Sequence, residues 1–190
     1  MKIVLATAGS RGDVQPYVAL GKGLAAHGHD VRVLATDDFE GLVTDAGLTF
    51  CSTGANVQQI MEGGDWEEIT ERGNFLVILQ KMRGEMKKVA ASMTPRMLEG
   101  SRGADLMIGG LGVITGGFSV AEKLNMPAIV AHVFPFDPTS EFASPITPDL
   151  PFGNALNRLS FHAGRQMFWQ TMRISDVIVR QTLDMPPASF

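Results

Sequence analysis

Residues 8–13 gather the side chains of this sequence that are best suited to chemistry, in the order Ala-Gly-Ser-Arg-Gly-Asp. An apolar run precedes them, and Pro16 suits the first turn of a helix that follows. Free amides and the helix dipole at such a start favour an anionic group. Gly9 and Gly12 would let the backbone approach a ligand closely, and the Asp13 carboxylate could accept a proton.

Three interpretations of this loop stay open. It could be a dinucleotide fingerprint with Asp37 or Asp38 as ribose ligand, although the spacing is GxxG and not GxGxxG. Asp13 could only cap the helix. Asp13 could instead be a general base on the floor of a cleft at the carboxyl ends of the strands. Arg11 could orient a phosphate or the loop, or be a solvated charge.

The elements that must position this loop follow from apolar runs and turn residues. Strands are predicted at residues 1–7, 31–35, 48–51, 104–108 and 128–133. Helices are predicted from Pro16 to Gly28, over 37–47, over 74–99 with an interruption near Pro95, over 115–124 and over 154–183. Residues 134–152 carry five prolines and are expected to form a long irregular loop. The pattern predicts an α/β fold, a Rossmann-like doubly wound parallel sheet with helices on both faces.

Composition limits the class of protein. The 190 residues favour a single globular domain over 1–190, with 45% hydrophobic and 19% charged residues. A net charge of -4 argues against nucleic acid as a partner. The single cysteine, Cys51, fits a reducing cytoplasm, and four scattered histidines make a metal site unexpected. No run is long enough to span a bilayer, and surface contact with a membrane stays open.

Three separated motifs carry a family resemblance. Residues 7–31, TAGSRGDVQPYVALGKGLAAHGHDV, resemble the opening of the sterol 3-beta-glucosyltransferases and of the glycopeptide and macrolide antibiotic glycosyltransferases. Residues 132–139, HVFPFDPT, resemble a later loop of the sterol type. The tail follows the family in order and spacing, with GNALNRLS at 153–160, FW at 168–169 and LDMPP at 183–187. The resemblance covers nearly the whole chain and is weakest between residues 56 and 95.

The resemblance implies the N-terminal, acceptor-binding half of a GT-B glycosyltransferase. The implied reaction transfers a hexose from a UDP- or TDP-sugar to a hydroxyl of a lipophilic acceptor, such as a sterol or polyketide. The configuration at the anomeric carbon would be inverted. Asp13 would be the base, and Ser10, with Gly9, Arg11 and Gly12 around it, would lie near the donor phosphates. The nucleotide sugar is a co-substrate, and no metal cofactor is implied. The histidine–aspartate pair of plant relatives cannot form here, so Asp13 would act alone.

The acceptor would lie among the loops that follow the first, third, fourth and fifth strands. The expected wall residues are Trp66, Phe75, Met82, Met86, Gly110, His132, Phe134, Phe136 and Thr139. Any single methionine or phenylalanine among them is more typical of a core position than of a binding wall. His132 could contact an acceptor hydroxyl or be a core histidine whose hydrogen bonds are satisfied.

The family's donor-binding domain starts a helix with H-x-G-x-G-[ST], and that motif does not occur in this sequence. The nucleotide-sugar domain is therefore expected to lie outside this chain, and the chain alone is expected to be inactive. The face exposed between domains would then be free to form oligomers. The rival interpretations are a non-catalytic Rossmann-like module that binds a lipophilic ligand or nucleotide, a nucleotide-dependent oxidoreductase, and a partner-docking domain.

Overall fold

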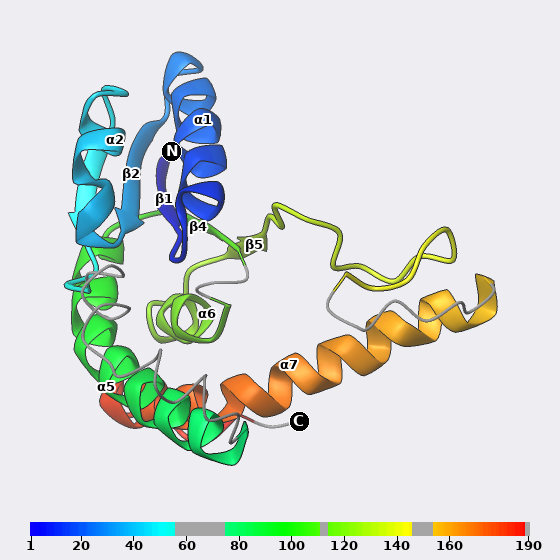
Figure 1. Ribbon diagram of the computed structural model, residues 1–190. Coiled ribbons are helices and arrows are strands. Elements are labelled where there is room, and N and C mark those ends of the chain that lie inside the picture. Colours follow the sequence, from blue (N-terminus) through cyan, green and yellow to red (C-terminus); the bar gives the residue numbers. More distant parts are fainter. Residues whose placement is uncertain (56–74, 111–113, 146–153, 189–190) are drawn as a thin grey trace.

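The computed structural model describes residues 1–55, 75–110, 114–145 and 154–188 (Figure 1). Its centre is a sheet of five strands: β1 Lys2–Ala6, β2 Asp30–Ala35, β3 Thr49–Ser52, β4 Leu106–Gly109 and β5 Ala128–Val130. Their order is β3-β2-β1-β4-β5, and every neighbouring pair is parallel. The chain reverses its direction of winding between β1 and β4, which confirms the doubly wound, Rossmann-like fold. Ligands bind at that reversal point in open α/β sheets, outside the carboxyl ends of the strands.

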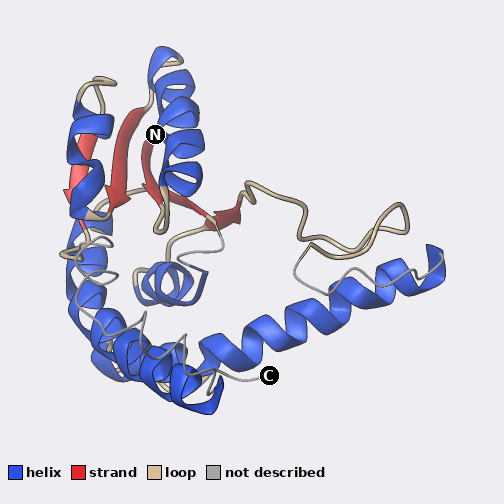
Figure 2. Ribbon diagram, viewed as in Figure 1, coloured by secondary structure: helices blue, strands red, loops and turns tan. Residues whose placement is uncertain are grey.

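Helices cover both faces of the sheet (Figure 2). In chain order they are α1 Arg11–Ala26, the short η1 Asp37–Phe39, α2 Glu40–Thr44, α5 Phe75–Ser101, α6 Ile114–Lys123 and α7 Asn154–Thr182. The first three lie against one face, α5 and α6 lie against the other, and α7 packs mainly on α5 and α6. The result is a three-layer domain.

Alternation along β1 explains this arrangement, because successive side chains of a strand point to opposite faces. Ile3 and Leu5 pack with α1 and α2. Val4 and Ala6 pack with the buried residues of α5, α6 and α7. All four are at most 3% exposed, so β1 is buried on both faces, as its continuous apolar run predicts.

The loop after β5 lies along α7. The Ser144 amide donates to the Ser160 hydroxyl at 2.8 Å, and Asn157 Nδ2 donates to the Ser140 carbonyl at 3.0 Å. The Phe142 ring packs on Phe161, which is fully buried. Residues 131–145 contain no helix or strand, as the prolines predict.

The expected interruption of α5 near Pro95 is wrong. The helix runs unbroken from Phe75 to Ser101. Proline leaves the carbonyl four residues back without its donor, and here both Ala91 and Pro95 are exposed, where water can replace it. Met93 and Met97 are buried in the core on the other side, so packing keeps the helix continuous through the proline.

The fifth strand is also shorter than expected, because β5 ends at Val130 and not at residue 133. Its neighbour β4 ends at Gly109, which accepts a last hydrogen bond from the Ala131 amide at 2.9 Å. Beyond that point the chain has no strand to pair with among the described residues. Within the same described part of the chain, no helix is both long and apolar enough to cross a membrane.

Two glycines of α1 test how closely that helix approaches the sheet. A Cβ at Gly21 would lie 2.8 Å from Leu48 Cδ1 and 3.1 Å from Leu5 Cδ1, whereas a Cβ at Gly23 would meet nothing within 4 Å. We expect Gly21→Ala to lower the free energy of unfolding by about 1–2 kcal/mol through overpacking. Gly23→Ala should raise it by about 0.5–1 kcal/mol, because alanine favours the helix. Urea unfolding of both variants measures the pair, and equal effects would contradict this packing.

Candidate active site

The start of α1 holds Asp13 in a defined position. Its Oδ2 accepts hydrogen bonds from the Ser10 amide at 2.7 Å and from the Ser10 hydroxyl at 2.9 Å. Ser10 is the N-cap residue of α1, so Asp13 caps the helix from its first turn. Among the described residues, none donates a hydrogen bond to Asp13 Oδ1. The carboxylate is therefore fixed through one oxygen and has the other available.

Gly9 is required by this geometry. Its φ of +130° is a conformation that other residues rarely adopt, and a Cβ there would lie 2.4 Å from Asp13 Oδ2. Gly12 has no such constraint, since a Cβ would stay 3.5 Å from Ser10 Oγ. Arg11 is exposed and donates from Nε to Gln15 Oε1 at 3.0 Å, along the surface of α1. The loop is thus built around the Asp13 carboxylate.

Tyr17 connects α1 to the chain that leaves β5, the edge strand of the sheet. It lies one turn after Asp13, is 3% exposed and donates its hydroxyl to the carbonyl of Ala131, just past β5. Burial, and then the Asp13 carboxylate, raise the pKa of the Tyr17 phenol, which keeps it a donor. Gly110 makes room for the phenol, because a Cβ there would lie 2.2 Å from Tyr17 Oη. The structure thus brings Gly110, an expected acceptor residue, against Tyr17.

His132, which follows Ala131, is the first residue of an aromatic cluster. Its ring lies 4.9 Å from that of Phe136, and Phe136 in turn packs edge-on against Phe134 at 6.2 Å and Phe168 at 5.9 Å. Burial lowers the pKa of His132, Asp137 opposes that shift, and Arg165 adds to it. His132 Nδ1 is buried and has no hydrogen-bond partner among the described residues. The structure places an imidazole with an unpaired Nδ1 at the carboxyl edge of β5.

The remaining expected acceptor residues are less informative. Thr139 is half-buried and accepts a hydrogen bond from the Glu141 amide at 3.2 Å, within the loop. Phe75, Met82 and Met86 belong to α5, but their side chains lie outside what the structure describes. Trp66 also lies outside the described residues.

Asp37 bears on the dinucleotide interpretation. The carboxylate of Asp37 follows β2 and accepts a hydrogen bond from the Ser52 hydroxyl at the end of β3. The same hydroxyl accepts from the Gly54 amide at 2.9 Å. Asp37 Oδ1 therefore joins the ends of two strands, and this bond leaves the second carboxylate oxygen of Asp37 unused.

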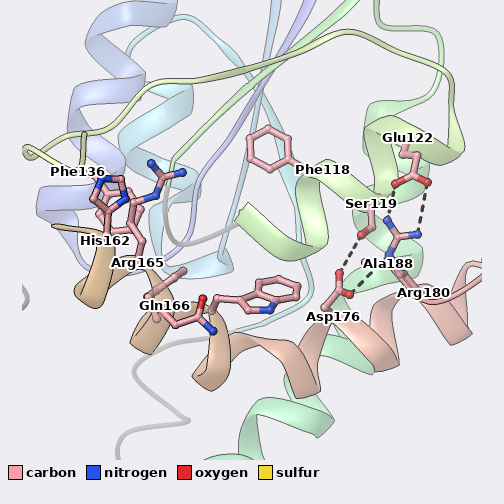
Figure 3. Close-up of a pocket in the computed structure, with 12 residues that line it drawn as sticks. Phe118, Ser119, Glu122, Phe136, His162, Arg165, Gln166, Asp176, Arg180 and Ala188 are labelled. Atoms are coloured by element: carbon pink, nitrogen blue, oxygen red, sulfur yellow. Dashed lines mark hydrogen bonds and ion pairs between the residues drawn. The ribbon is translucent and has the colours of Figure 1, made fainter. Parts of the chain in front are cut away.

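A cavity of 760 Å³ lies between α6, α7 and the loop after β5 (Figure 3). Its aromatic lining comes from Phe118, Phe136, Phe168 and Trp169. Its polar lining comes from Ser119, Glu122, His162, Arg165, Gln166, Asp176 and Arg180, and Ala188 completes it. The size and mixed lining suit a small-molecule ligand. Of the expected acceptor residues whose side chains the structure describes, only Phe136 lines the cavity. The Phe168–Trp169 pair of the tail motif was the sequence signal for two of the other lining residues.

One end of this cavity is a charged cluster that the sequence does not reveal, in which Asp176 and Arg180 are buried and Glu122 is exposed. Arg180 forms ion pairs with Glu122 at 2.5 Å and with Asp176 at 3.6 Å, and Ser119 donates to Asp176 at 3.4 Å. Burial raises the pKa of Asp176, while Arg180 and the Ser119 hydroxyl act against that rise. The cluster ties α6 to α7 beside the cavity.

The sheet order and the glycine loop after β1 define a Rossmann-like α/β domain. The profile of the glycosyltransferase family 28 N-terminal domain matches residues 3–143, and the chain belongs to this family.

Relatives of known sequence support this membership. The chain is 32% identical over 178 residues to a sterol 3-beta-glucosyltransferase of Cryptococcus neoformans, covering 90% of this chain and 11% of that protein. It is 29% identical over 192 residues to an uncharacterized glycosyltransferase of Mycobacterium leprae, covering 100% of this chain and 43% of that protein. The chain thus spans about a tenth of the fungal relative and less than half of the mycobacterial one.

A solved structure shows the same fold. The glycosyltransferase SsfS6 of Streptomyces sp. SF2575 aligns over 100% of this chain and 48% of its own, with a TM-score of 0.57 and 20% identity. The same enzyme complexed with thymidine diphosphate aligns over 93% of this chain and 46% of its own, with a TM-score of 0.53 and 22% identity.

The pKa of His132 gives a test of the edge beside the cavity. We expect its NMR titration midpoint to lie below the ordinary value of about 6.5, because burial disfavours the imidazolium. Asp137→Asn should lower the midpoint further, and Arg165→Gln should raise it. Since the folded protein binds this proton less readily, the contribution of His132 to stability is complete above pH ~6.5 and falls below it. An unshifted midpoint, or shifts of the opposite sign, would contradict the arrangement.

Proposed function

We propose that this chain is the acceptor-binding part of an inverting glycosyltransferase, which transfers a hexose from a nucleotide-diphosphate sugar to a hydroxyl of a lipophilic acceptor. The observation that carries the proposal is the aromatic-lined cavity, which a series of contacts connects to the helix that carries Asp13. Tyr17 bonds Ala131, His132 follows, and His132 packs on Phe136, which lines the cavity. Four aromatic rings provide the apolar surface that a sterol or polyketide skeleton needs.

In the proposed reaction Asp13 is the general base. As the acceptor oxygen attacks the anomeric carbon, its proton passes to Asp13 Oδ1. A new carbon–oxygen bond forms, and the bond from the anomeric carbon to the nucleotide diphosphate breaks with inversion. The two Ser10 hydrogen bonds to Oδ2 support this role, because they hold the carboxylate in one orientation while Oδ1 stays available.

The donor diphosphate would approach the start of α1. Amides at a helix N-terminus favour negative charge, and Ser10 and Arg11 stand at that end of α1. The thymidine diphosphate held by SsfS6 supports a nucleotide-diphosphate donor for this chain. In relatives that are at least twice as long, more chain is available to bind the rest of the nucleotide sugar. We therefore propose that residues 1–190 bind the acceptor and need a donor-binding partner domain to transfer sugar.

One observation favours a second candidate, a module that binds a lipophilic ligand without catalysis. The Ser10–Asp13 cap by itself accounts for the aspartate in the loop. Under this alternative, loss of the carboxylate would affect the stability of α1 and nothing else.

Replacing Asp13 distinguishes the glycosyltransferase from the non-catalytic module. In the chain joined to its donor-binding half, Asp13→Asn should lower kcat by a factor of about 10² to 10⁴, the range for losing a general base, while acceptor affinity is kept. The measurement is turnover of UDP- and TDP-sugars with a panel of sterols and polyketides, beside acceptor binding and Tm.

Asp37→Asn is the matched control, because it removes another carboxylate at the same edge that is already bonded to Ser52. Its kcat should stay near that of the parent. Near-normal turnover of Asp13→Asn would refute the base assignment and favour the non-catalytic module.

A further inference from the structure

The cavity has polar groups at two opposite ends. In Figure 3, Phe136, His162 and Arg165 lie together at one end, the cluster of Asp176, Arg180, Glu122 and Ser119 lies at the other, and Phe118 lies between them. His162 and Asp176 are both on α7, and the rise of a helix separates them by about 21 Å. Trp169, seven residues from each, lies on the same face of the helix and lines the cavity between them. The cavity therefore suits an elongated, largely apolar molecule.

The far end contains an incompletely paired donor. Arg180 is 9% exposed and Asp176 is 6% exposed. Arg180 Nη1 and Nη2 bond Glu122 and the Pro186 carbonyl. Arg180 Nε is buried and has no hydrogen-bond acceptor among the described residues, since Asp176 Oδ2 is 3.6 Å away. Burying a donor that has only this long ion-pair contact is costly, so an acceptor atom closer to Nε would stabilise the cluster.

The charges of the cluster select the kind of ligand atom. Asp176 and Glu122 are carboxylates and Arg180 is the only cation among these three, so a further anion would be repelled. A ketone oxygen could accept from Nε but could give nothing to Asp176. A hydroxyl can do both, because it accepts from Nε and donates its proton to the carboxylate. An alcohol therefore matches the gap better than an acid or a ketone.

We propose that Asp176 and Arg180 are specificity-determining residues that recognise a second hydroxyl on the acceptor, at the end far from the hydroxyl that reacts. This inference rests on the proposed function, since it takes the cavity to be the acceptor site. The preferred substrate class is then an elongated apolar alcohol with hydroxyls at both ends.

Two sterols that differ by one distal hydroxyl test this on the 190-residue chain. Equilibrium dialysis would compare cholesterol with 25-hydroxycholesterol, which carries the additional hydroxyl at the tip of its side chain. We expect the dihydroxy sterol to bind about tenfold more tightly to the parent chain. In Asp176→Asn that preference should fall to about twofold, because a charge-assisted hydrogen bond becomes a neutral one.

Further variants separate recognition from folding. Arg180→Lys keeps the cation but removes Nε, and should also reduce the preference to about twofold. Trp169→Ala should weaken the binding of both sterols and leave the ratio of their affinities near ten, since it removes only apolar surface. Asp45→Asn changes the same charge at an exposed position after α2 and should change neither affinity. Circular dichroism melting establishes that each variant is folded.

The outcomes distinguish the two proposals. Equal binding of the two sterols to the parent chain, or a tenfold preference that persists in folded Asp176→Asn and Arg180→Lys, would overturn the distal-hydroxyl assignment alone. Binding of neither sterol would overturn it together with the use of this cavity for sterol-like acceptors.

Discussion

The hydrogen bond from the Tyr17 hydroxyl to the Ala131 carbonyl is the contact on which the geometry of the candidate site depends. It crosses the reversal point of the sheet and links α1, which carries Asp13, to the chain leaving β5. A residue with a side chain at position 110 would displace the phenol, so the glycine after β4 belongs to the same arrangement. This contact fixes the position of the Asp13 carboxylate relative to His132, the first residue of the aromatic cluster.

The helices on the two faces of the sheet build different parts of the candidate site. Helix α1 packs against one face and brings the glycine loop to the carboxyl edge. Helices α6 and α7 belong to the layer on the other face, and the cavity opens between them and the loop after β5. Arg180, Asp176 and Glu122 join those two helices where the cavity is most polar. The loop with Asp13 and the polar end of the cavity are thus built by different layers that meet only at the edge of the sheet.

Local patterns in the sequence were sufficient for the order of the strands and the sheet class, because each strand depends on residues close in the chain. The predicted start of α1 at Pro16 is wrong, since the helix begins at Arg11 and Pro16 lies inside it. Pro95 was misjudged because the packing of Met93 and Met97, which holds α5 together, is a tertiary effect. The cluster of Arg180 with Glu122 joins residues 58 positions apart, and neither residue stands in a recognisable motif. Phe136 was predicted from its loop, whereas its partner Phe168 was seen only as part of a helical tail. Both contacts that the sequence did not reveal involve residues of α7, and they depend on how α7 packs against α6 and the loop after β5.

Capping and proton abstraction need not be rival roles for Asp13. A cap requires one carboxylate oxygen to accept from the N-terminal backbone, and Oδ2 meets that need through Ser10. A general base requires a carboxylate held in one orientation with a lone pair facing the substrate, and the same two hydrogen bonds provide the first of these conditions. Because a single aspartate three residues after Ser10 could serve either role, the sequence pattern could not separate them. The positive φ of Gly9 fits both roles as well, since it lets the carboxylate lie close against the loop and leaves the Ser10 amide aimed at Oδ2.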